Sequence, residues 1–240
     1  MAIDIADKSQ KNLELEFNKR GIWLTKFTID GVEYGGKFDP SAEKCIKLFF
    51  DYFPNAKRIL ELGSLEGGHT FTLASHSGVS QVIGIEGRKD NMERARFVQK
   101  LLGIHNVDFV EANLEKVDLS RFGRFDVVFC VGILYHMPEP WLLLEQIGHV
   151  SKNLFIRTHY VDSQKSDEAV EGYEGIFYEE KGLKDSLGGL STKSFWPSLD
   201  SLTKMLTRHG FEIFNIIYNE TNHPNGPRLT AVASSKKLTA

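Results

Sequence analysis

The chain of 240 residues is 41% hydrophobic and 25% charged, with a net charge of −3, which is ordinary for one α/β domain with elaborations. The near-neutral charge gives no electrostatic argument for a nucleic-acid surface, and no run approaches the roughly 20 apolar residues of a membrane-spanning helix. The polar N-terminus has no apolar core of signal-peptide length, and the two cysteines indicate no disulfide framework, so we expect a cytoplasmic protein.

The first part of the chain predicts a helix, a hairpin and a second helix. Residues 8–19 have helical apolar spacing, and residues 21–36 alternate in polarity about the turn signal Asp30-Gly31. An Asp-Pro-Ser sequence is a helix-start signal and predicts a helix over 41–52.

From residue 58 onward, strand and helix patterns alternate. The predicted strands are 58–62, 81–86, 107–111, 125–131 and 153–158, and the predicted helices are 67–77, 90–102 and 139–150. This alternation is typical of a parallel sheet covered by helices on both faces. This alternation of strand and helix patterns ends before the segment 161–197. Much of that segment is polar and contains several glycines with aromatic residues between them, a composition that favours a lid. A helix at 198–209 and strands at 211–218 and 228–235 follow.

The stretch from Arg58 to Arg96 has the layout of a nucleoside-binding unit. An apolar strand leads into a turn with Gly63 and Gly67, where the backbone can turn sharply and approach a ligand. Glu86 ends the next strand, where its carboxylate can accept hydrogen bonds from the two hydroxyls of a ribose. We therefore predict a nucleoside-binding crevice in an α/β fold.

Two more strand ends add to this crevice. Asn113 and Leu114 follow the third strand, and their amide and apolar side chains suit the recognition and packing of an adenine. The fourth strand ends in Val131-Gly132, where the glycine again allows a ligand to approach closely.

With these features the chain resembles the class I S-adenosylmethionine (SAM) methyltransferases over roughly residue 39 to the end. The family pattern occurs in order as Glu61-Leu62-Gly63, Glu86, Asn113 and Asp126. The resemblance implies a Rossmann-like α/β fold with a seven-stranded, mostly parallel sheet of order 3-2-1-4-5-7-6. Leu65 departs from the pattern, because it replaces the middle glycine of the turn. Its side chain narrows the room for a pyrophosphate, which favours SAM over a dinucleotide.

The resemblance also implies a set of SAM contacts. They are Glu61, Gly63, Ser64, Leu65, Gly67, His69, Thr70, Glu86, Gly87, Asn113, Leu114, Val131 and Gly132. His69 and Thr70 open the first helix, so their N–H groups and the Thr70 hydroxyl either face the SAM carboxylate or simply cap the helix.

A narrower likeness concerns residues 132–137, 195–198 and 210–211. These segments are similar to the tRNA wobble-uridine carboxymethyltransferases and to a set of bacterial methyltransferases of largely unassigned substrate. The former carry a basic RNA-binding region that is not recognisable in this sequence. The likeness therefore covers the shared catalytic core and not the RNA specificity.

Two histidines, His136 and His159, follow predicted strands four and five, at the edge where open α/β sheets bind ligands. A hydroxyl acceptor is helped by a general base, and histidine is the usual choice because it titrates near neutral pH. The alternative for His136 is helix capping and loop packing. We consider as acceptor contacts Tyr34, Tyr135, Arg157, Tyr160 and Trp196. Metal-ligand spacing is absent, so we predict no metal site.

We interpret residues 1–40 as a helix-and-hairpin extension and 41–240 as a SAM-binding methyltransferase domain with a lid insertion at 161–197. The predicted function is methyl transfer from SAM to a small molecule or sugar, at oxygen, with neither a nucleic acid nor a membrane as partner. A tRNA-modifying methyl- or carboxymethyltransferase and a SAM-binding subunit without catalysis are the alternatives. The acceptor and the oligomeric state are open.

Overall fold

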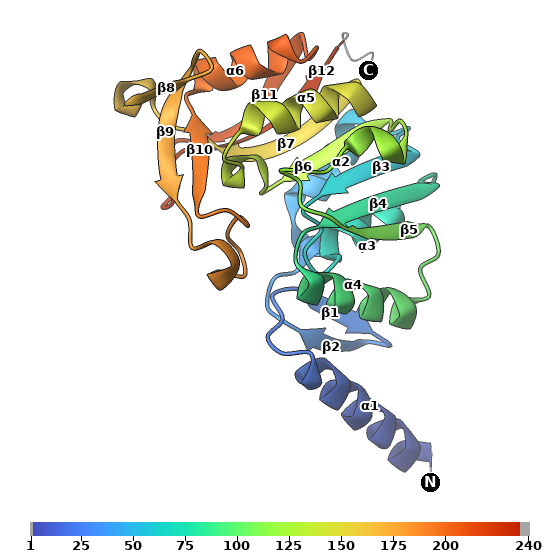
Figure 1. The fold of residues 1–240 in the computed structure, drawn as a ribbon. Coiled ribbons are helices and arrows are strands. Elements are labelled where there is room, and N and C mark those ends of the chain that lie inside the picture. The colour runs from blue at the N-terminus through green and yellow to red at the C-terminus, as the bar shows by residue number, and fades with distance from the viewer. Residues whose placement is uncertain (1, 236–240) are drawn as a thin grey trace.

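The computed structural model describes the backbone of residues 2–235 and the side chains of residues 10–235. Its centre is a seven-stranded sheet of order β11-β12-β7-β6-β3-β4-β5 (Figure 1). The strands are β3 (Arg58–Leu62), β4 (Gln81–Glu86), β5 (Val107–Glu111), β6 (Val127–Val131), β7 (Asn153–His159), β11 (Ile213–Glu220) and β12 (Arg228–Ser234).

The topology of this sheet confirms the predicted order. The neighbours β5-β4, β4-β3, β3-β6 and β6-β7 are parallel, whereas β12 is antiparallel to both β7 and β11. Strand order therefore reverses between β3 and β6, and open α/β sheets bind their ligands at the carboxyl ends of the strands beside such a reversal. The predicted strand bounds agree with the observed ones to within two residues.

Helices cover both faces of the sheet, because alternate residues of each central strand are apolar. In β6, Val127 and Phe129 pack on one face, while Val128 and Cys130 pack on the other. The first face is covered by α2 (Lys44–Tyr52), α3 (Gly68–Ala74) and α4 (Lys89–Leu102), and the second by α5 (Pro140–Val150) and α6 (Leu199–Arg208).

The N-terminal extension is α1 (Ala2–Lys19) followed by the hairpin β1 (Lys26–Ile29) and β2 (Val32–Gly35), as predicted. The helix starts earlier than the apolar spacing indicated and extends away from the body of the molecule (Figure 1). Phe17 anchors its last turns by packing on Trp23 and Tyr34. The predicted helix over 41–52 divides into a 3-10 turn (Pro40–Ala42) and α2, which begins at Lys44.

The segment 161–197 is more regular than its sequence indicates. It forms a three-stranded antiparallel sheet of β8 (Glu168–Val170), β9 (Tyr173–Glu179) and β10 (Lys193–Pro197). Gly175 is required in β9, because a Cβ there would lie 2.3 Å from the carbonyl oxygen of Trp196. Glycines that indicated a loop therefore allow strand pairing instead. Short 3-10 helices complete the fold at Leu119–Phe122, Leu134–His136, Ser163–Lys165 and Gly182–Lys184.

Within the described residues, none of the helices combines the length and the apolar character that crossing a bilayer requires.

Candidate active site

A cavity of about 580 Å³ lies at the carboxyl ends of the central strands, beneath the segment 178–190. The predicted SAM contacts that line it are Gly63, Ser64, Leu65, His69, Glu86, Gly87, Asn113, Leu114, Val131 and Gly132. His69 lies in α3, and the others come from the ends of β3, β4, β5 and β6, so the chain brings four strand ends to one wall. The wall lies at the reversal of strand order, where this class of sheet binds ligands.

Glu86 is held at this wall by the backbone. Its Oε2 accepts a hydrogen bond from the Leu65 N–H at 2.9 Å, and its Oε1 accepts one from the Arg88 N–H at 2.7 Å. Burial raises the pKa of Glu86, and the two backbone donors oppose that rise. Each carboxylate oxygen has a second lone pair, so the fixed group can still accept from the hydroxyls of a ribose.

The turn after β3 has the backbone that its glycines require. Gly63 has φ of 73°, and a Cβ there would lie 2.0 Å from Cδ1 of Ile133. Leu65 also has a positive φ, 51°, although it is not a glycine. This strained residue carries the N–H that fixes Glu86, so the departure from the family pattern lies in the ligand-facing turn itself.

A polar atom without a partner lies near Glu86. Ser64 Oγ is buried and has no hydrogen-bond partner within residues 10–235, and Ser64 lines the cavity. Buried polar groups in native proteins are nearly always satisfied, so this hydroxyl indicates a polar ligand at this end of the cavity. Asn91 also lines the cavity, and its side chain interacts with Glu86 and lowers the pKa of that carboxyl. Together with the Glu86 carboxylate and the Asn113 amide, the Ser64 hydroxyl fits a nucleoside.

Three of the predicted SAM contacts lie behind the wall instead. Glu61, Gly67 and Thr70 do not line the cavity, and the Thr70 hydroxyl donates to the Glu61 carboxylate rather than facing a ligand. Burial raises the pKa of Glu61 to about 7, although the nearby His69 and the hydrogen bond from Thr70 oppose this shift. The side chain of Thr70 is turned inward because it is a fully buried position of α3.

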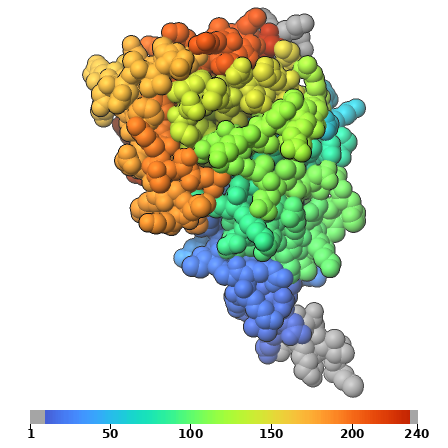
Figure 2. All heavy atoms as spheres, viewed as in Figure 1, coloured from blue at the N-terminus to red at the C-terminus, as the bar shows by residue number. Residues whose placement is uncertain are grey.

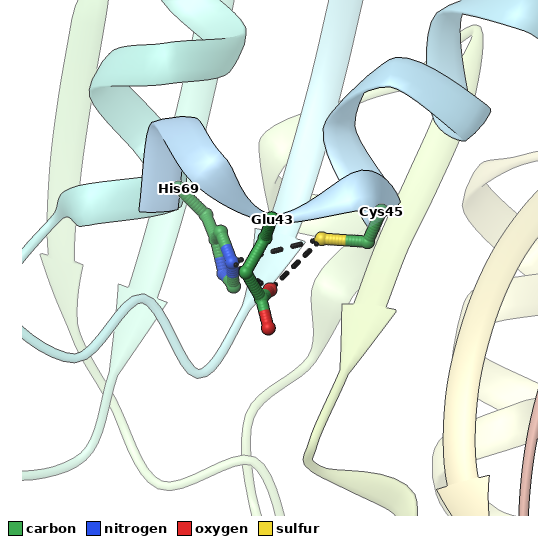
Figure 3. A group of neighbouring side chains, drawn as sticks. All are labelled: Glu43, Cys45 and His69. Atoms are coloured by element: carbon green, nitrogen blue, oxygen red, sulfur yellow. Dashed lines mark hydrogen bonds and ion pairs between the residues drawn. The ribbon is translucent and has the colours of Figure 1, made fainter. Parts of the chain in front are cut away.

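A second polar cluster was not indicated by the sequence. Figure 3 shows the side chains of Glu43, Cys45 and His69 pointing toward one another. Their potential metal-binding atoms all lie within 4.8 Å of one another. Glu43 Oε2 lies 2.9 Å from His69 Nε2 and accepts from Cys45 Sγ at 3.1 Å. Burial and the charge of Glu43 raise the pKa of the Cys45 thiol far above its usual range. A protonated thiol and an occupied carboxylate make this cluster a hydrogen-bonded network, to which we assign no metal.

Arg157 belongs to this network and not to the acceptor end of the cavity. Its Nη1 lies 3.1 Å from Glu43 Oε1, and the residue does not line the cavity. The prediction that Arg157 contacts the acceptor is therefore not supported by its position. Strand β7 points the side chain toward α2, whose start supplies Glu43.

Two further residues that were predicted to contact the acceptor, Tyr34 and Tyr160, also lie away from the cavity. Tyr34 lies in the hairpin core, stacked on Phe17 with ring centroids 5.0 Å apart. Tyr160 is buried in the main core and donates its hydroxyl to Asn219 Oδ1 at 2.8 Å. Side chains alternate across an extended chain, so Tyr160 faces away from the cavity that His159 lines.

The remaining predicted acceptor-end residues do meet at one place. His136, His159, Tyr135 and Trp196 all line the cavity. The ring of His159 stacks on Trp196 with centroids 4.9 Å apart and meets the edge of Tyr135 at 4.7 Å. Trp196 is also stacked on Tyr178, and its buried Nε1 has no partner within residues 10–235. This end of the cavity is therefore aromatic, with polar atoms available for a ligand.

The segment 178–190 supplies residues that the sequence did not indicate. Glu180 Oε1 lies 2.7 Å from His136 Nδ1, and Tyr178 and Glu179 also line the cavity. Convergence of residues 136 and 180 depends on how the small sheet docks, and no local sequence pattern encodes that. The adjacent acids Glu179-Glu180 within an aromatic segment were the one available signal.

Arg88 holds the segment 178–190 over the cavity through hydrogen bonds. Its Nη2 lies within 3.3 Å of the carbonyl oxygens of Gly182, Asp185, Gly188 and Gly189. Figure 2 shows the orange surface of the segment lying directly against the blue-green surface that follows β4. Because Arg88 donates its backbone N–H to Glu86, the cofactor end and the segment are joined through one residue.

The comparisons with known proteins agree with this geometry. The profile of a family described as a methyltransferase domain matches residues 54–185, more than half of the chain. The chain belongs to this methyltransferase family. It is also similar to the crystal structure of the N-terminal domain of EvdMO1 in the presence of S-adenosylhomocysteine (SAH) and D-fucose. That likeness has 32% identity and a TM-score of 0.86, and it covers 95% of this chain and 97% of the other.

Curated relatives are more distant. The tRNA U34 carboxymethyltransferase of Alteromonas mediterranea is 25% identical over 70% of this chain and 48% of its own length. The enzyme of the same name from Marinobacter nauticus is 29% identical over 67% of this chain and 46% of its own length. The methyltransferase described here therefore spans about half the length of these curated relatives.

The chain is thus a SAM-dependent methyltransferase with a Rossmann-like fold, and SAM is its cofactor. The unpartnered Ser64 hydroxyl and the fixed Glu86 carboxylate form the end of the cavity that fits its nucleoside. When bound, SAM supplies a methyl group on a positively charged sulfur, which is open to attack by a nucleophile.

Proposed function

We propose that this methyltransferase transfers the methyl group of SAM to a hydroxyl group of a sugar or a sugar-like small molecule. The observation that carries the proposal is the second end of the cavity, where His136, His159 and Trp196 lie together. Aromatic faces pack against the apolar faces of sugar rings, and imidazole nitrogens hydrogen-bond to hydroxyls. The solved structure of the EvdMO1 domain with SAH and D-fucose supports a sugar as the class of acceptor.

The residues of the cavity divide into two groups on this proposal. The ends of β3, β4 and β5 hold the nucleoside through Glu86, Asn113 and their neighbours. The ends of β6 and β7 present histidines to the acceptor, and the insertion closes the cavity and excludes water from it. Holding nucleophile and methyl group in contact reduces the barrier by several kcal/mol, of the order seen for well-oriented reactants.

Incubation of the protein with SAM and a panel of deoxy and ordinary monosaccharides, free and as nucleoside diphosphate sugars, tests the proposal. We expect mass spectrometry to detect a product heavier by one methylene group for at least one sugar, together with SAH in equal amount. The proposal is contradicted if none of the sugars is methylated while a protein, lipid or other metabolite in cell extract is.

A tRNA is the second candidate acceptor, favoured by the names of the curated relatives. Binding of tRNA to this chain should then depend steeply on salt, because phosphate contacts release counterions. Electrophoretic mobility shifts at two salt concentrations, followed by nucleoside analysis of the tRNA, distinguish the two acceptors. If the wobble uridine of the tRNA is modified, tRNA replaces a sugar as the proposed acceptor. If the tRNA is neither bound nor modified, this alternative is removed.

A further inference from the structure

The acceptor end of the cavity contains two histidines in different electrostatic settings. The side chains of His136 and Glu180 are 13% and 6% exposed, and His136 Nδ1 lies 2.7 Å from Glu180 Oε1. An ionised carboxylate only accepts hydrogen bonds, so His136 Nδ1 is the donor. The tautomer is thereby fixed, and Nε2 of His136 keeps its lone pair.

The surroundings of Glu180 favour its ionised form. Burial would raise its pKa, but the hydrogen bond from His136, with further ones from the Gly189 N–H and the Ser194 hydroxyl, lowers it overall. Within residues 10–235, the only ion pair of Glu180 is with His136. Its negative charge is therefore available to stabilise the imidazolium that forms when His136 takes a proton.

His159 is oriented just as firmly but lacks such a charge. Its Nδ1 lies 3.1 Å from the carbonyl oxygens of Gly226 and Pro227, so Nδ1 carries the proton and Nε2 the lone pair. Burial, together with the nearby His223 and Arg228, lowers the pKa of His159. This ring can accept a hydrogen bond, but it resists taking up a proton.

We infer that His136 is the general base of the transfer, that Glu180 positions it from the insertion, and that His159 binds the acceptor as a neutral hydrogen-bond acceptor. This inference rests on the proposed function, since a base is needed for a hydroxyl acceptor. The acceptor O–H proton passes to Nε2 of His136, and the oxygen forms a bond to the methyl carbon. The bond from that carbon to sulfur breaks, and its electron pair remains on the sulfur. The products are the methyl ether, SAH and one proton, which His136 releases to solvent.

The same arrangement gives the insertion a role beyond covering the cavity. Glu180 follows β9, and its own backbone N–H donates to the Thr192 carbonyl at 2.8 Å, next to β10. Arg88 holds the loop that continues from it. The base is therefore completed by the same segment that covers the cavity, since Glu180 reaches His136 from the docked insertion.

Other titratable groups face this end of the cavity and enter any pH profile. They are Glu179, Lys181 and Asp185 from the insertion, Tyr135 and Tyr178 beside the rings, and His223 and Arg228 near His159. The decisive comparison is therefore made between variants at one position and not from the absolute profile.

The test is the pH dependence of kcat/KM for wild type, Glu180→Gln and the control Glu174→Gln, an exposed acid of the same strand β9. Glutamine can still accept from Nδ1 but carries no charge. We expect Glu180→Gln to lower kcat about 100-fold, within the usual range for acid–base groups. The acidic limb of its pH profile should move to lower pH, because the variant lacks the negative charge that stabilises the protonated base. The control should match the wild type, and SAH affinity by calorimetry should be unchanged in both.

His159→Gln completes the experiment. We expect it to raise KM for the acceptor about tenfold, as for one lost hydrogen bond to a ligand, with little change in kcat. If His159→Gln abolishes the acidic limb while Glu180→Gln leaves it in place, the roles are reversed and the inference fails.

A readout without turnover separates this inference from the proposed function. The Nδ1–H signal of the His136 ring in NMR spectra, with SAH bound, should change in Glu180→Gln and stay unchanged in Glu174→Gln, because the hydrogen bond to a carboxylate is replaced by one to a neutral amide. If both variants give the wild-type signal, Glu180 does not act on His136, whatever the acceptor is. If the signal changes but no hydroxyl compound is methylated by wild type, the proposed function fails instead. Loss of SAH binding in Glu180→Gln would show a structural role and would also overturn the inference. The variant Glu180→Asp keeps the negative charge, so it should restore the wild-type pH profile of kcat/KM.

Discussion

The cavity has a histidine–carboxylate pair on each side, and the two pairs differ in what else their carboxylate binds. Glu43 holds His69 at 2.9 Å but also receives Arg157 and the Cys45 thiol. Glu180 holds His136 at 2.7 Å together with two neutral donors. The negative charge of Glu43 is shared with Arg157, whereas within residues 10–235 the only ion pair of Glu180 is with His136. Short distance alone therefore does not identify a base; the remaining charge of the carboxylate does.

The largest effect that this comparison predicts is on the two histidines. His136→Asn should lower kcat at least about 100-fold, because it removes the base, and should leave SAH affinity unchanged. His69→Asn should do the opposite, weakening SAH about tenfold through the cofactor end of the cavity while kcat changes less than this. Steady-state kinetics and calorimetry on both variants check this. Equal losses of kcat in the two variants would break the distinction between the pairs.

Glu86→Ala should have the next largest effect and should act at the cofactor end alone. The change removes the acceptor proposed for the ribose hydroxyls and also frees the Leu65 and Arg88 N–H groups. Hydrogen bonds to charged groups contribute about 1.5–3 kcal/mol, so SAM and SAH should bind roughly ten- to a hundredfold more weakly. Calorimetry measures both ligands. Unchanged affinity, with the variant folded by circular dichroism, would remove Glu86 from the ribose site.

The variant Glu43→Gln tests the Glu43–His69 pair through the free energy of unfolding. Burial opposes ionisation of Glu43, but His69 and Arg157 outweigh it and lower the pKa to about 2. A depressed pKa contributes stability that is present above about pH 4.5 and is lost as pH falls toward 2. The variant should therefore be less stable than wild type by about 2 kcal/mol at pH 7, and the gap should narrow below pH 5. Urea unfolding at pH 7, 5 and 4 measures this gap.

Glu61→Gln is the matched contrast on the other side of His69. The pKa of Glu61 is raised, to about 7, chiefly by burial. A raised pKa contributes stability below about pH 4.5 that is lost as pH rises through 7, which is the opposite sign. The glutamine variant should lose less stability than wild type between pH 5 and 8. If both variants showed the same pH dependence, the assignment of charge around His69 would be wrong.

The smallest effect is expected from Arg88→Lys. Lysine keeps the charge but cannot present the planar guanidinium that Arg88 places among four loop carbonyls. Hydrogen exchange of residues 182–189 should speed up a few-fold, while β9 and β10 remain protected as in wild type. Exchange in this loop equal to that of wild type would show that Arg88 does not hold the insertion closed.

The sequence predicted the parts of this molecule that depend on local pattern. Apolar runs such as 125–131 indicate buried strands, so the strands could be predicted from pattern, whereas their order was implied by the resemblance to class I SAM methyltransferases. The end of β4 at Glu86 followed from the same pattern. The small sheet of the insertion was missed because Gly172 and Gly175 are needed for its turn and close pairing, yet they also mark loops.

Within the site, the residues that directly follow a strand could be predicted from the sequence. Glu43 and Glu180 reach their histidines from segments 26 and 44 residues away in the chain, and no spacing rule encodes such contacts. Tyr34 and Tyr160 lie away from the cavity for one reason. Tyr34 lies in β2 and Tyr160 directly follows β7, and the alternation of side chains along extended chain turns each toward a core.

The central claim, transfer to one sugar hydroxyl held between His136 and His159, is tested most directly with a series of deoxy sugars. An accepted sugar is compared with analogues that each lack one hydroxyl, using SAM with a trideuterated methyl group and mass spectrometry of the product. We predict that the label is lost completely for one analogue, which lacks the acceptor hydroxyl, and is retained at reduced rate for the others. Label on every analogue, or label on nitrogen or carbon, would contradict the account.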